Sequence, residues 1–152
     1  MNTIVVIVGI FLAYRIISTF LFPMSTNAKQ LELKDILEIS SSGKLGNKDM
    51  VILDVRRPDE FGSGHVKSAK NVPVQELGQA LQLTPSEFEA KYGFKLPAND
   101  SQTGVAVHCM RGSRAQMAAS LLAEADYKDN LYVYLPGWTE LASAADAQIE
   151  TL

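Results

Sequence analysis

From residue 30 onward, short apolar runs with strand character alternate with segments of helix character. The strand-like runs are QLEL at 30–33, VILDV at 51–55, KNVPV at 70–74, GVAVH at 104–108 and LYVYL at 131–135. Uninterrupted apolar runs are typical of strands that are buried on both faces, and strands that alternate with helices favour a parallel sheet. The sequence therefore predicts an α/β fold: one central, mostly parallel five-stranded sheet with helices on both faces.

Start and stop signals mark several of the intervening helices. KDILEISSSG predicts a helix that ends at Gly43. Thr84, followed by Pro85 and by Glu87, has the pattern of a capping box at the start of another helix. The segment SRAQMAASLLAEADY at 113–127 predicts the helix that follows GVAVH.

An apolar segment precedes this alternating body. Residues 3–22, TIVVIVGIFLAYRIISTFLF, carry Arg15 as their only charge, and Pro23 ends the run. A helix of this length spans about 30 Å, the thickness of a bilayer core. No basic region precedes the run and no small-x-small cleavage site follows it, which disfavours a cleaved signal peptide. We therefore expect residues 1–23 to form an apolar helix that anchors the chain in a membrane, joined by a linker at 24–29 to a domain at 30–152.

The flanks of this segment give its orientation. Met1 and Asn2 carry no side-chain charge, whereas Lys29 and Lys34 follow the segment. The positive-inside rule then places the domain in the cytosol. An alternative start at Met24 would give a soluble protein without the anchor, and the sequence leaves this alternative open.

Composition excludes several kinds of site. The formal net charge of -3 and the lack of a basic run argue against a protein that binds nucleic acid by neutralising phosphates. Cys109 is the only cysteine, which excludes an internal disulfide and a zinc site built from several thiolates. His65 and His108 are the only histidines, and their spacing fits no known ligand pattern. The sequence therefore predicts no nucleic-acid partner and no metal.

The single thiol lies in HCMRGSR at 108–114, between a predicted strand and a predicted helix. Ligand sites of parallel α/β sheets lie at this end of the strands. A thiol attacks as the thiolate, and the start of a helix, two arginines and inward-turned backbone amides would all favour that form. We predict that Cys109 is a nucleophile in a cradle for an anion, which is formed by Met110, Arg111, Gly112, Ser113 and Arg114.

The length of the loop distinguishes two chemistries. Four residues separate Cys109 from Arg114, whereas enzymes similar to tyrosine phosphatases have five residues between cysteine and arginine. The tighter loop suits one extra sulfur atom better than a tetrahedral oxyanion.

Three patches, taken in order, give the chain its resemblance to a known family. DVRRPDEFGSGHVKSAKNVPV at 54–74, VHCMRGSR at 107–114 and YLPGWTEL at 134–141 resemble the signature of single-domain rhodaneses, which are thiosulfate sulfurtransferases. Pro136 stands where the family has the first glycine of Gly-Gly-Trp. The insert QLTPSEFEAKYGFKLP at 82–97 resembles that of small eukaryotic sulfurtransferases that pass thiosulfate sulfur to thiols such as glutathione.

The resemblance, which covers about residues 30–145, implies a rhodanese-like domain and a two-step reaction without a cofactor. The Cys109 thiolate would take the outer sulfur of thiosulfate, release sulfite and keep the sulfur as a persulfide. The acceptor that then collects it would be a small thiol such as glutathione, or thioredoxin, or cyanide. The resemblance also allows a sulfane-sulfur donor other than thiosulfate. In this picture Arg111 attracts the thiosulfate dianion and Arg114 closes the loop.

Four further residues are expected to support the loop. Asp54, Arg56 and Glu60 form a charged set beside a strand end, which we interpret as an ion-pair network, and His65 is expected to orient a turn. Two other functions remain as alternatives: a noncatalytic or regulatory binding module, and a phosphatase or arsenate reductase on the same fold. The retained Cys109 argues against the first alternative, and the short loop argues against the second.

Overall fold

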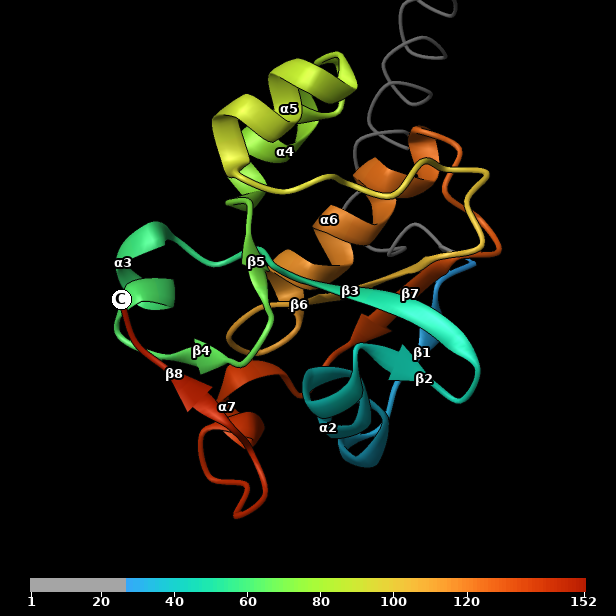
Figure 1. Cartoon of the computed structure of the whole chain (residues 1–152). Coiled ribbons are helices and arrows are strands. Elements are labelled where there is room, and N and C mark those ends of the chain that lie inside the picture. Colours follow the sequence, from blue (N-terminus) through green and yellow to red (C-terminus); the bar gives the residue numbers. More distant parts are fainter. Residues whose placement is uncertain (1–26) are drawn as a thin grey trace, which may run out of the picture.

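The sheet observed in the computed structural model, which describes residues 27–152, is curled and mostly parallel (Figure 1). The proposed anchor at 3–22 and the alternative start at Met24 lie outside the described residues. Within 27–152, no helix combines the length and apolar character needed to cross a membrane.

Five strands of the sheet run parallel, which confirms the predicted direction. In spatial order they are β1 (Lys29–Gln30), β7 (Leu131–Tyr134), β6 (Gly104–His108) and β3 (Lys48–Asp54), and β5 (Lys70–Asn71) also pairs with β3. A sixth strand, β2 (Lys44–Leu45), corrects the predicted number of five. It runs antiparallel to β3 because only Gly46 and Asn47 connect the two strands, and so short a loop can join only antiparallel neighbours.

Two predicted strands are shorter than expected. The run QLEL does not continue as a strand because Glu32 and Asp35 form a capping box that starts helix α2 (Leu33–Ser42). The run KNVPV is a strand only to Asn71, because Pro73 is the N-cap of helix α4 (Val74–Ala80). A proline also has no backbone N–H to donate to a strand ladder.

Helices α5 (Pro85–Tyr92) and α6 (Ser113–Glu124) agree with the segments predicted for them, and α3 (Pro58–Gly62) and α7 (Gly137–Leu141) are two further short helices. The Thr84 capping box is present, since the Thr84 side chain accepts a hydrogen bond from the backbone N–H of Glu87. Gly43 ends α2 in the left-handed conformation, with φ of 73°. These local signals were sufficient to predict where the helices start and end, because each of them acts within one turn of helix.

Alternating side chains of the central strands fill two separate core layers. Leu53, Val105 and Val107 pack with residues of α4, α5 and α6, whereas Ile52 and Ala106 pack with residues of α2, α3 and α7. Helices therefore cover both faces of the sheet, as predicted.

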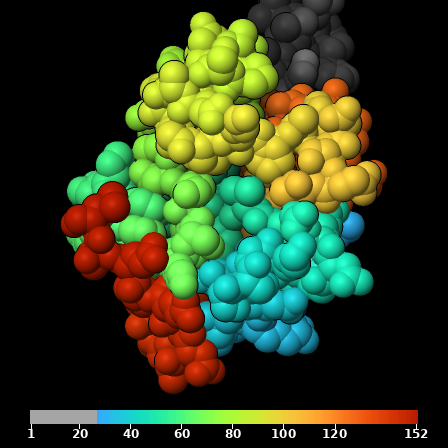
Figure 2. Space-filling model, in the orientation of Figure 1, coloured from blue at the N-terminus to red at the C-terminus, as the bar shows by residue number. Residues whose placement is uncertain are grey.

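The C-terminal segment adds a second, small sheet. Strand β8 (Ile149–Glu150) pairs antiparallel with β4 (His65–Val66). The backbone N–H of Leu152 donates to the carbonyl of Gly62. Figure 2 shows this red segment lying against the green region that contains α3 and β4, while the α4–α5 region forms another end of the molecule.

Candidate functional site

Cys109 lies at the carboxyl edge of the parallel sheet, directly after β6 and before the loop that enters α6. Because β6 runs between β3 and β7, the ends of both neighbouring strands, Asp54 and Tyr134, flank the same edge. This is the position at which a ligand site of such a sheet is expected.

The thiol is almost completely buried, and a backbone amide points at it. Cys109 is 1% exposed, and its Sγ accepts a hydrogen bond from the N–H of Gly112 at 3.1 Å. Within residues 27–152, no other N–H of the predicted cradle donates to Sγ. Met110 is half-buried, and Arg111 and Ser113 are exposed. The loop therefore already holds the sulfur through one amide and presents polar side chains to the outside.

A glycine is required at position 112 for two reasons. Its φ of 98° lies in a region that side chains rarely adopt, and a Cβ there would lie 2.7 Å from the carbonyl oxygen of Leu135. Gly112 therefore packs closely against Leu135, the residue that follows β7.

Helix α7 donates hydrogen bonds to the first two carbonyls of the loop. The N–H of Trp138 donates to Cys109 O at 2.7 Å, and both the N–H and the hydroxyl of Thr139 donate to Met110 O, at 3.2 and 3.1 Å. The described peptide bonds are all trans. The N–H groups that share these two peptides therefore point away from α7.

Gly137 allows α7 to approach these two carbonyls closely, and the sequence analysis did not predict this role. Its φ is 69°, and a Cβ would lie 2.5 Å from Cys109 O and 2.6 Å from Met110 O. The available signal was the Pro-Gly pair directly after the last predicted strand, at the same sheet edge as Cys109. Pro136 itself adopts a helical conformation as the N-cap of α7.

Asp54 and Arg56 form a fully buried ion pair beneath the loop. The Arg56 guanidinium donates to both carboxylate oxygens of Asp54, the shortest distance being 2.7 Å from Nη2 to Oδ2. It also donates to the carbonyls of Gly64 and Glu60, and it stacks 4.6 Å from the ring centroid of Trp138. Asp54 and Arg56 of the expected charged set pair with each other here, whereas Glu60 contributes only its backbone carbonyl to Arg56. These contacts join β3, α3 and α7.

Glu60 and Arg114 form a second pair at the start of α6. Arg114 donates to both Glu60 oxygens, at 2.7 and 2.9 Å. The Arg114 hydrogen bond lowers the pKa of Glu60 to about 2 despite its partial burial, and Glu60 in turn raises the pKa of Arg114. Arg111 differs, because it is exposed and makes no ion pair within residues 27–152. Arg111 is thus the arginine of the loop whose charge stays available to an anion.

His65 shapes a corner of the fold beside this site. Its Nδ1 donates to the carbonyl of Phe61 at 2.9 Å, its ring stacks on the Phe61 ring at 3.7 Å, and its Nε2 lies 3.7 Å from Glu150. These contacts agree with the expected role in orienting a turn, since they join α3, β4 and β8. Within 27–152, no group of three metal-ligating side chains is present.

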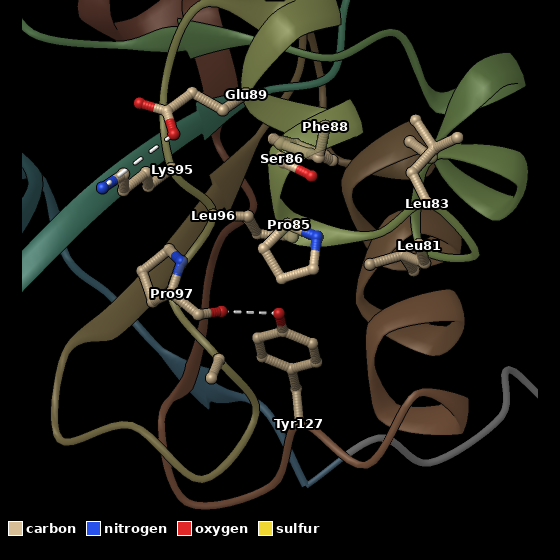
Figure 3. A pocket seen from close by; sticks show the side chains of 12 residues that line it. Leu81, Leu83, Pro85, Ser86, Phe88, Glu89, Lys95, Leu96, Pro97 and Tyr127 are labelled. Carbon is tan, nitrogen blue, oxygen red and sulfur yellow. Dashed lines mark hydrogen bonds and ion pairs between the residues drawn. The ribbon is translucent and has the colours of Figure 1, made fainter.

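The insert at 82–97 contributes to a separate cavity of about 460 Å³, which is largely apolar (Figure 3). The hydroxyl of Tyr127 donates to the carbonyl of Pro97 at 2.6 Å, and burial raises the pKa of Tyr127 to about 12. Tyr127 follows the C-terminal end of α6, whereas Cys109 precedes its N-terminal end. The length of that helix, about 18 Å, lies between them.

Comparisons with known proteins agree with this geometry. A family model described as the rhodanese-like domain matches residues 41–144. A mitochondrial protein of Schizosaccharomyces pombe, provisionally named as a thiosulfate sulfurtransferase, is 34% identical over 128 residues, which cover 83% of this chain and 88% of that protein. The human thiosulfate:glutathione sulfurtransferase is 30% identical over 100 residues, covering 66% of this chain and 82% of that protein.

A solved structure extends the likeness to three dimensions. The human single-domain sulfurtransferase TSTD1 superposes with a TM-score of 0.66 at 25% identity, covering 80% of this chain and 100% of that chain. The chain belongs to the rhodanese-like domain family.

Proposed function

We propose that the protein is a thiosulfate sulfurtransferase, which moves sulfane sulfur from thiosulfate to a small thiol such as glutathione, or to cyanide, through a persulfide on Cys109. One observation carries the proposal. The solitary thiol at the sheet edge accepts a hydrogen bond from a backbone amide, while the first two carbonyls of its loop are bound by N–H groups of α7. The names of the relatives support the donor and the acceptor class.

In the first half of the reaction, the Cys109 thiolate attacks the outer sulfur of thiosulfate. A new S–S bond forms at Sγ while the S–S bond of thiosulfate breaks, and sulfite leaves with the electron pair of that bond. The Gly112 N–H, already 3.1 Å from Sγ, stabilises negative charge at the sulfur. Exposed Arg111 raises the local concentration of the dianion.

In the second half, the thiolate form of the acceptor attacks the terminal sulfur of the persulfide. The bond between Sγ and that sulfur breaks, its electron pair returns to Sγ, and the acceptor leaves as its own persulfide. With cyanide the product is thiocyanate. The burial of Cys109 keeps bulk water from the stored sulfur between the two halves.

Arg114 fits this reaction better than phosphoryl transfer. One edge of the guanidinium, formed by Nη1 and Nη2, is already engaged by Glu60 and does not serve as a fork for an oxyanion. Arg114 then closes the loop by holding α6 to α3, while Asp54, Arg56 and His65 support the strands and turns around it.

The mass of the intact protein tests the proposal. Incubation with thiosulfate, without reducing agent, is expected to add one sulfur, ~32 Da, to the wild type and nothing to Cys109→Ser. Addition of glutathione or cyanide should remove that mass. A protein that gains no sulfur would instead fit a binding module, and hydrolysis of an aryl phosphate that depends on Cys109 would fit a phosphatase.

The location of the protein is a separate proposal, which rests on the sequence of residues 3–22. We propose that this segment is a single-pass anchor with the catalytic domain in the cytosol. Fractionation of cells should find the full chain in the membrane pellet after a carbonate wash, and a chain that begins at Met24 in the supernatant. Recovery of the full chain in the supernatant would reject the anchor and favour the soluble form.

A further inference from the structure

His108 is a buried polar residue at the last position of β6, directly before the thiol. In the sheet register it lies between Asp54 of β3 and Tyr134 of β7. Its side chain is completely buried, and its Nε2 has no hydrogen-bond partner within residues 27–152. The proposed sulfur transfer gives this residue no role.

The two ring nitrogens face different acceptors. Nδ1 lies 3.3 Å from the carbonyl oxygen of Cys109, within hydrogen-bond distance. Nε2 lies 3.5 Å from Asp54 Oδ2, with which it makes no hydrogen bond. A neutral imidazole has one N–H, so only one of the two nitrogens can donate.

The surroundings decide which nitrogen carries the proton. The Asp54 carboxylate already accepts from the backbone N–H of Arg56 and from two nitrogens of its guanidinium. Burial, together with the nearby charge of Arg56, lowers the pKa of His108, although Asp54 acts in the opposite direction. We therefore expect a neutral ring with its single N–H on Nδ1, from which it donates to the Cys109 carbonyl oxygen at 3.3 Å.

We propose that His108 is a positioning residue of the sulfur-transfer loop, which holds the Cys109 carbonyl through its Nδ1–H. The same carbonyl accepts from the Trp138 N–H at 2.7 Å. It is thus held by a donor from α7 and by a donor from β6, and its peptide plane fixes the direction of the Met110 N–H. This role rests on the proposed function, because it concerns the direction of the loop N–H groups around Cys109 Sγ, the atom that receives the second sulfur.

Two substitutions separate the nitrogens. In His108→Asn the side-chain NH₂ takes the position of Nδ1, and in His108→Gln it takes the position of Nε2. We expect His108→Asn to keep kcat for transfer from thiosulfate to cyanide within about twofold. We expect His108→Gln to lower kcat about fivefold with KM unchanged, the size expected for one neutral hydrogen bond. Both variants are compared by urea unfolding, so that a difference in kcat without a matching difference in stability identifies positioning.

A spectrum of the wild type reports the tautomer directly, without a kinetic comparison of the variants. The chain has two histidines, so ¹⁵N spectra contain two imidazoles, and the His108→Asn spectrum identifies the signals of His108. We expect a protonated Nδ1 and an unprotonated Nε2 at pH 7.5. An Nε2–H tautomer, or equal kcat values for the two variants, would overturn the positioning role. A wild type that forms no persulfide would overturn the sulfurtransferase function instead, so the two failures are distinct.

Discussion

Two carboxylate–arginine pairs of the same chemistry lie around the Cys109 loop, and they differ in burial. The side chains of Asp54 and Arg56 are 0% and 1% exposed, whereas those of Glu60 and Arg114 are 15% and 24% exposed. The shortest N–O distance is 2.7 Å in both pairs. Since a buried charge without its partner is far more costly than an exposed one, the first pair is expected to control the fold and the second to control the loop.

The other contacts of the two arginines increase this difference between the pairs. Arg56 also donates to two backbone carbonyls and stacks on Trp138, so its loss disturbs three segments of chain at once. Arg114 joins only α6 to α3 through Glu60. Substitutions test this difference between the two pairs. Their effects on the free energy of unfolding are expected to decrease in the order in which they are given below.

The largest loss is expected for Asp54→Asn. The change leaves the Arg56 guanidinium buried without a counter-charge, which typically costs about 3–5 kcal/mol. Urea unfolding at pH 7 measures it. Asp49→Asn is the matched control, because Asp49 pairs with Lys44 on the surface, and it should cost about 0.5 kcal/mol or less. A loss below about 1 kcal/mol for Asp54→Asn would mean that the buried pair does not govern the fold.

The buried pair also illustrates how much of the site the sequence could reveal. The runs VILDV and GVAVH identified the central strands because burial on both faces leaves them uninterruptedly apolar. Asp54 and Arg56 were recognisable as charges at a strand end. That they are almost fully buried was not, because burial depends on segments far away in sequence, such as α7.

Other features were not predictable for the same reason. The strands β2, β4 and β8 have two residues each, too few to show a periodic pattern. The need for glycine at 137 comes from the carbonyls of Cys109 and Met110, which approach it only in the folded chain. Local signals such as the Thr84 cap could be predicted, whereas contacts across the sheet edge could not.

An intermediate effect is expected for Arg114→Lys. The lysine keeps the charge but lacks the two parallel N–H groups with which Arg114 meets both Glu60 oxygens, so stability should fall by about 1 kcal/mol. Because α6 is then held less firmly, kcat for sulfur transfer should fall severalfold. Arg57→Lys is the control, since Arg57 forms a similar two-bond pair with Asp59 on the surface. Equal kcat values for the two variants would show that the Glu60 pair does not control the loop.

A smaller effect should appear as a pH dependence of stability. The pKa of Glu60 is lowered from its ordinary value of 4.5 to about 2, so the folded state favours the ionised form. The stabilisation is therefore complete above about pH 4.5 and is lost as the pH falls toward 2. Thermal unfolding between pH 6 and pH 2.5 should show the wild type losing its advantage over Glu60→Gln across this window. A constant difference between them would contradict the assignment.

The smallest change in stability is expected for Arg111→Ala, because Arg111 is exposed and makes no ion pair within residues 27–152. The free energy of unfolding should stay within about 0.5 kcal/mol of the wild type. The KM for thiosulfate should nevertheless rise severalfold at low salt with kcat unchanged, and the difference should shrink at high ionic strength, since screening weakens attraction of the dianion. Arg111→Lys, which keeps the charge, should restore most of the affinity. A fall in kcat at saturating thiosulfate would instead place Arg111 in the transfer step itself, together with the Gly112 amide.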